Sequence, residues 1–120
     1  MAYEGGCGCG AVRYRAVGDP KFVANCHCAS CRHHTGAAFS TWAGFRDDQV
    51  EWTGDRSLHE SSPGVRRGFC AKCGTPLSYQ GEKWPGETHL TLGSLDDPAA
   101  LTPKGDAFAA EALDWSKPRA

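Results

Sequence analysis

The chain has 120 residues, which suits a single domain over residues 1–120, and its formal net charge is −1. Acidic and basic residues are mixed along it, without the lysine and arginine stripe with which proteins follow a phosphate backbone, so we expect no nucleic-acid partner. No apolar run approaches the ~20 residues that cross a bilayer, and residues 1–6 have neither the basic start nor the apolar core of a signal peptide. We therefore expect a cytoplasmic protein with no membrane partner.

The chain is rich in turn-forming residues, with 15 glycines and 7 prolines. Between the turns, alternating polarity predicts short strands. Residues 11–17 are the clearest case, because Val12, Tyr14 and Ala16 share one face and arginines occupy the other. In residues 39–45 the odd-numbered positions are expected to share a face. In chain order the predicted strands cover residues 11–17, 21–25, 39–45, 49–53, 57–61, 65–69, 77–80 and 89–93.

Helices are predicted to be few or absent. Residues 28–35 favour a turn or a single helical turn, because Gly36 and a pair of histidines suit a compact loop. Residues 96–101 predict one short helical turn, capped by an aspartate and with Pro98 in its first turn. Many short strands without amphipathic helices predict a mainly β architecture.

The cysteines are the most informative feature, because all of them fall into tight groups. Two thiolates separated by one or two residues can chelate a metal, and zinc favours thiolate sulfur. A disulfide framework is disfavoured by the odd total of 7, by a reducing compartment and by the close spacing, and a redox Cys-x-x-Cys is the weaker alternative to metal. The groups are Cys7-Gly8-Cys9, Cys26-His27-Cys28-Ala29-Ser30-Cys31 and Cys70-Ala71-Lys72-Cys73.

The number of cysteines predicts two unlike metal sites. A closed structural zinc takes four ligands, and the remaining three cannot close a second tetrahedron. The surplus therefore indicates one closed zinc and one zinc with a vacant position, which suggests an enzyme. Cys70 and Cys73 have the spacing of a zinc knuckle, with Gly74 to let the backbone bend, and Cys7 and Cys9 could complete that site. Counting alone does not decide which four cysteines close it.

From about Gly5 to Asp97 the sequence resembles the glutathione-dependent formaldehyde-activating enzymes. The resemblance implies a zinc-bearing β-tent of short antiparallel strands. It also implies two zinc ions per chain, a structural one on Cys7, Cys9, Cys70 and Cys73 and a second on Cys26, Cys28 and Cys31. The matching segments are Gly6-Cys7-Gly8-Cys9-Gly10-Ala11-Val12, Cys26-His27-Cys28, Cys31-Arg32, Thr35-Gly36-Ala37, Phe69-Cys70-Ala71-Lys72-Cys73-Gly74-Thr75-Pro76 and Leu95-Asp96-Asp97.

The activity implied by the resemblance is addition of glutathione to formaldehyde by a carbon–sulfur lyase. The expected partners are therefore a small thiol such as glutathione and a small aldehyde. The alternative is a non-catalytic zinc-binding module or chaperone that binds a protein partner. A zinc ribbon that binds nucleic acid is disfavoured by the slight excess of acidic residues.

Four residues outside the cysteine groups are weaker candidates for substrate binding. His33 and His34 directly follow the second group and could relay a proton near neutral pH. Arg66 and Arg67 could grip a glutathione carboxylate through bidentate hydrogen bonds. His27, between two cysteines, is a candidate fourth ligand, although a side chain in that position more often points away from the metal.

Overall fold

The computed structural model describes residues 1–116 and 118. Its one α-helix is α1 (Ala29–Thr35), and 3-10 turns lie at Asp47–Gln49, Leu92–Ser94, Pro98–Ala100, Ala109–Glu111 and Asp114–Ser116. The strands are β1 (Ala2–Gly6), β2 (Arg13–Val17), β3 (Phe22–Cys26), β4 (Ser40–Arg46), β5 (Val50–Thr53), β6 (Ser57–Ser62), β7 (Val65–Phe69), β8 (Pro76–Gly81), β9 (Glu87–Thr91) and β10 (Asp106–Ala107).

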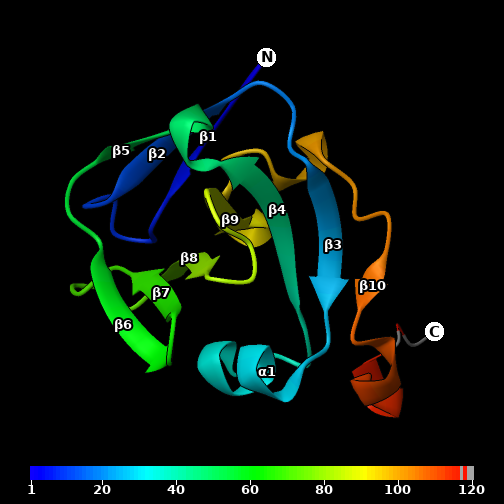
Figure 1. Ribbon diagram of the computed structural model, residues 1–120. Coiled ribbons are helices and arrows are strands. Elements are labelled where there is room, and N and C mark those ends of the chain that lie inside the picture. Colours follow the sequence, from blue (N-terminus) through cyan, green and yellow to red (C-terminus); the bar gives the residue numbers. More distant parts are fainter. Residues whose placement is uncertain (117, 119–120) are drawn as a thin grey trace.

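The strands form two sheets, which confirms the mainly β prediction. A small sheet has the order β1-β2-β5, and a large one has the order β10-β3-β4-β9-β8-β7-β6 (Figure 1). All pairs within them are antiparallel except β10 with β3, which run parallel. Every predicted strand is present, with each end within two residues of the prediction.

The core lies between the two sheets. Tyr3 and Tyr14 from the small sheet belong to the same buried cluster as Phe45, Leu77 and Leu90 from the large sheet. The rings of Tyr3 and Phe45 are 6.1 Å apart, which places the two sheets in direct contact. The buried face predicted for residues 11–17 is confirmed, since Val12, Tyr14 and Ala16 are all at most 2% exposed.

Strand β4 is buried on both faces, so its sequence does not show a full alternation of apolar and polar residues. Ala43 and Phe45 share one face, as predicted, and this face belongs to the core, but Trp42, the residue before Ala43, is also buried. Trp42 packs edge-on against Tyr79 from β8, on the other face of the large sheet. A strand covered on both sides loses the period of two by which strand faces are read from sequence.

Strand β1 was not predicted, because its Glu-Gly-Gly segment lacks strand-forming side chains. Tertiary packing explains the glycine. A Cβ atom on Gly5 would lie 2.5 Å from the Ser94 carbonyl oxygen and from the Tyr14 hydroxyl oxygen. The backbone therefore comes so close to the core at this point that only glycine fits.

Two helical predictions need correction. Residues 29–35 form a helix of 7 residues rather than a single turn, with Cys28 as its N-cap and Gly36, at φ 73°, as its C-cap. The turn predicted near Pro98 is present, but Asp97 at its N-cap makes no side-chain capping hydrogen bond. Asp96 instead forms an ion pair with Arg13. Among the helices in the described part of the chain, none is long and apolar enough to cross a lipid bilayer.

Core burial predicts unequal costs for two leucine truncations. Leu77 is 0% exposed, whereas Leu58, on the edge strand β6, is 50% exposed. Leu77→Ala should lower the free energy of unfolding by about 3 kcal/mol, because it removes buried methyl groups and leaves a cavity. Leu58→Ala, the matched control, should cost about 0.5 kcal/mol or less. Urea unfolding measures both, and equal costs would contradict the assigned core.

Candidate metal centres

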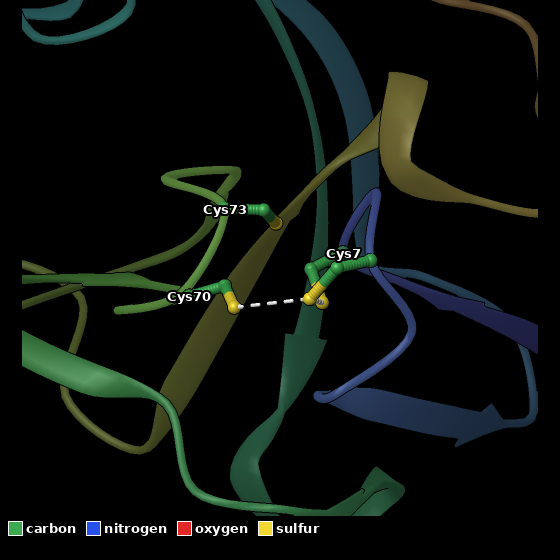
Figure 2. A group of neighbouring side chains, drawn as sticks. Cys7, Cys70 and Cys73 are labelled. Carbon is green, nitrogen blue, oxygen red and sulfur yellow. Dashed lines mark hydrogen bonds between the residues drawn. The ribbon is translucent and has the colours of Figure 1, made fainter.

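Four cysteines come together where a loop of the small sheet meets a loop of the large sheet. Cys7 and Cys9 lie between β1 and β2, and Cys70 and Cys73 lie between β7 and β8. Their sulfur atoms all lie within 4.8 Å of one another. In Figure 2, the side chains of Cys7, Cys70 and Cys73 point toward a common space. We call this group the four-cysteine cluster.

Local hydrogen bonds shape both loops of the four-cysteine cluster. In the second loop, the Gly74 N–H donates to the Cys70 carbonyl, and Gly74 has a φ of 81°, the left-handed turn predicted for a zinc knuckle. The Val12 N–H donates to the Cys7 sulfur. The loops are tied together by a hydrogen bond from the Gly8 N–H to the Thr75 hydroxyl, 3.0 Å long. The cysteines are thus placed by backbone turns as well as by their own sulfur contacts.

The sulfur spacing fits a tetrahedral zinc ion. A Zn–S bond of about 2.3 Å places the corners of a thiolate tetrahedron about 3.8 Å apart. The sulfurs of Cys7 and Cys9 are 3.6 Å apart, and those of Cys9 and Cys70 are 3.8 Å apart. The four-cysteine cluster could therefore hold a metal ion and is compatible with zinc.

The second group forms at the junction of β3 and α1. Cys26 ends β3, Cys28 is the N-cap of α1, and Cys31 lies in the helix. The sulfurs of Cys26 and Cys28 are 3.5 Å apart, and all three lie within 4.8 Å of one another. Within residues 1–116 and 118, this group has no fourth histidine, cysteine, aspartate or glutamate. We call it the three-cysteine cluster, and its spacing fits three corners of a thiolate tetrahedron.

His27, a candidate fourth ligand by its position between two cysteines, is turned away from the three-cysteine cluster. Its ring is buried against Phe39, with ring centroids 5.1 Å apart. Its Nε2 atom is 2.8 Å from an Asp106 carboxylate oxygen. Because its two neighbours, Cys26 and Cys28, both turn toward the cluster, the side chain between them points to the opposite side.

The candidate substrate residues lie at unequal depths. Arg66 and His33 are exposed. Arg67 is 3% exposed, and both of its terminal nitrogens lie 3.8 Å from the Cys31 sulfur. His34 is half-buried, and burial followed by the positive charge of Arg67 lowers the pKa of its imidazole. Of the four candidates, the structure brings Arg67 and His34 toward the three-cysteine cluster.

Negative charge gathers on Cys31. Hydrogen bonding from Cys26, with smaller contributions from Cys28 and the Arg67 guanidinium, lowers the pKa of Cys31 to about 5 despite its burial. The same interaction with Cys31, together with burial, raises the pKa of Cys26. The three-cysteine cluster therefore carries thiolate character at its buried corner.

The C-terminal segment, from Gly105 on, packs beside the three-cysteine cluster. This contact is not predicted from the sequence. Strand β10 pairs with the end of β3, and the His27 N–H donates to the Ala107 carbonyl at 3.0 Å. One Asp106 carboxylate oxygen accepts a hydrogen bond from the Asn25 side-chain amide and is also the partner of the His27 ring. A two-residue strand has no periodicity, so the sequence carries no signal for this pairing.

Removing the Asp106 carboxylate should loosen this segment. In Asp106→Ala, the side chains of Asn25 and His27 lose their shared acceptor, so β10 should open more often. Hydrogen exchange of the Asn25 and His27 amides, which donate to Gly105 and Ala107, should become severalfold faster. Asp114→Ala, which changes an exposed carboxylate in the same segment, is the control. Unchanged exchange in Asp106→Ala would contradict the role given to this carboxylate.

Comparison with known proteins supplies the relatives of this chain. A family model described as glutathione-dependent formaldehyde-activating enzyme matches residues 2–111. A Halomonas elongata protein is 30% identical over 114 residues, covering 87% of this chain and 72% of that protein. It carries the provisional name of a glutathione-dependent formaldehyde-activating enzyme. An uncharacterised lyase of Schizosaccharomyces pombe is 30% identical over 77 residues, covering 64% of this chain and 56% of that protein. A crystal structure of a Rhodobacter sphaeroides protein has the same fold, with a TM-score of 0.69 and 21% identity over 87% of this chain and 99% of that one.

Proposed function

The chain belongs to the glutathione-dependent formaldehyde-activating enzyme family, and we propose that it is a zinc-dependent carbon–sulfur lyase that adds a thiol such as glutathione to formaldehyde or a related small aldehyde. The observation that carries the proposal is the contrast between the two clusters. The four-cysteine cluster has a complete set of sulfur ligands, whereas the three-cysteine cluster lacks one. A catalytic zinc site keeps such an open position, and a structural one does not.

The four-cysteine cluster would hold a structural zinc. Its sulfurs join loops from both sheets, so a metal there would cross-link the fold. The three-cysteine cluster would hold the second zinc, on Cys26, Cys28 and Cys31. When bound there, zinc would lower the pKa of a thiol at its fourth position and present the sulfur as a thiolate. No disulfide is formed by any cysteine, which suits a reducing compartment such as the cytoplasm.

The reaction joins the thiol sulfur to the carbonyl carbon of the aldehyde. The carbonyl π electrons move to the oxygen, and the proton lost by the thiol ends on that oxygen, so no oxidant or reductant is needed. His34 could carry this proton, because its lowered pKa leaves the imidazole neutral near pH 7 and able to accept it. Three thiolates leave a zinc ion electron-rich, so positioning of the two reactants should contribute more than activation of the carbonyl.

The two metal assignments predict different effects of serine substitutions. Cys73→Ser should lower the melting temperature by about 10 °C or more, because the metal that links the sheets is lost. Cys28→Ser should lower zinc from about two ions per chain to about one while the melting temperature changes by only a few degrees. Zinc analysis and calorimetry measure both. An equal collapse of the two variants would make the three-cysteine cluster structural and would contradict the catalytic assignment.

The activity itself predicts faster loss of formaldehyde when glutathione is present. The reference is the uncatalysed reaction at the same concentrations, because thiols add to formaldehyde unaided. The wild-type protein should exceed this rate, and Cys28→Ser should match it. If the wild-type rate equals the uncatalysed rate, the alternative of a non-catalytic zinc module that binds a protein partner is favoured instead.

A further inference from the structure

Arg67 carries a buried positive charge without a carboxylate partner. Its side chain is 3% exposed, and its Nε atom has no hydrogen-bond partner. In the described part of the chain, no aspartate or glutamate lies within ion-pair distance of it. By contrast, Arg13 pairs with Asp96 and Arg46 pairs with Asp48 at the surface. An isolated charge buried in this way would be costly, so an anion has to lie nearby.

The group that faces Arg67 is the sulfur of Cys31. Both terminal nitrogens of the guanidinium lie 3.8 Å from it, so the fork of Arg67 is aimed at the three-cysteine cluster. The aromatic ring of Tyr79 lies 5.1 Å from the guanidinium carbon and packs along it. This packing holds the charge against the sulfur and keeps it from reaching out to solvent.

The net charge of the three-cysteine site gives Arg67 a role. A divalent ion with three thiolates has one net negative charge, and a thiolate as fourth ligand brings this to two. In a half-buried site this excess is unfavourable unless a fixed cation offsets it. The four-cysteine cluster meets the same excess differently, because Cys9 and Cys73 are exposed to water.

We infer that Arg67 is the counter-charge of the three-cysteine site and favours an anionic thiolate over a neutral ligand in its fourth position. This inference rests on the proposed function, since it explains how a site that already holds three thiolates accepts another. Arg67 is therefore a specificity-determining residue that acts through the cluster. The role differs from the carboxylate-binding role that the sequence suggested, because the guanidinium is directed at sulfur.

The test is thiol binding to the cobalt-loaded protein, monitored by the sulfur-to-cobalt charge-transfer band. The variant is Arg67→Met, which replaces the charge with an unbranched apolar side chain that can remain buried. Arg67→Lys keeps a positive charge but lacks the two terminal nitrogens of the guanidinium. Arg66→Met removes a charge from the exposed neighbouring position. Three probes are titrated into each: 2-mercaptoethanol, which has no carboxylate, then glutathione, and imidazole as a neutral ligand.

The expected result is a loss of about tenfold in affinity for both thiols in Arg67→Met, with imidazole binding unchanged. Arg67→Lys should recover part of this loss, and Arg66→Met should bind 2-mercaptoethanol within about twofold of wild type. A loss confined to glutathione would overturn the inference in favour of a carboxylate contact. An equal loss for imidazole would also overturn it, because it would mean that the site had merely been distorted.

A second readout separates this inference from the proposed function. Competition with a chromophoric chelator measures zinc affinity at each cluster without any reaction. In Arg67→Met, zinc in the three-cysteine cluster should be released about tenfold more readily, whereas zinc in the four-cysteine cluster should be held as in wild type. Equal zinc affinity in wild type and Arg67→Met would overturn the counter-charge even if the enzyme proved active. Conversely, a wild-type protein without formaldehyde activity would refute the proposed function and leave this measurement valid.

Discussion

Two cysteine loops, one from each sheet, meet at the four-cysteine cluster. Gly8 and Thr75, 67 residues apart, are joined by a hydrogen bond, and the four sulfurs around them lie within 4.8 Å of one another. One loop belongs to the small sheet and the other to the large sheet, so this contact sets how the two sheets pack. The core between Tyr3 and Phe45 is closed by the same arrangement. Four thiolates this close would repel one another, which is why a bound cation suits the junction.

The two clusters differ in what offsets their negative charge. Cys9 and Cys73 of the four-cysteine cluster are exposed, so water can screen its negative charge. In the three-cysteine cluster, Cys31 is buried against Arg67, a cation that cannot lose its proton. The first arrangement suits a closed site that only needs to persist. The second suits a site that has to accept a further anion and release it, as the proposed thiol addition would require.

Contacts from distant segments complete the three-cysteine cluster. Arg67 comes from β7, and the C-terminal segment adds Asp106 through His27 and Glu111 through the N–H of Ala29. The candidate ligands of the cluster are therefore close together in the sequence, whereas the residues that surround them come from distant segments. Of the residues considered for substrate binding, Arg66 and His33 remain at the surface, and the structure assigns neither of them a partner. The specificity proposed for a thiol could thus be set at the sulfur itself, by charge, as well as by contacts with the rest of the substrate.

Apart from β1 and β10, the strands of the described residues could be predicted from the sequence, and so could the grouping of the cysteines, because both are local properties. The alternating polarity of residues 11–17 and the separation of the cysteines by two or three positions are patterns within a few residues. Spacing along the sequence is therefore enough to recognise both. The sequence does not show which cysteine groups meet, why β1 contains glycine beside Tyr14, or which of two adjacent arginines is buried, because these features depend on contacts between distant segments. Arg66 and Arg67 are the same residue type in adjacent positions, so the sequence does not distinguish them. They point to opposite faces because successive side chains of a strand alternate. Which face meets the cluster depends on where β7 lies relative to α1, and the contact between Arg67 and Cys31 joins residues 36 positions apart.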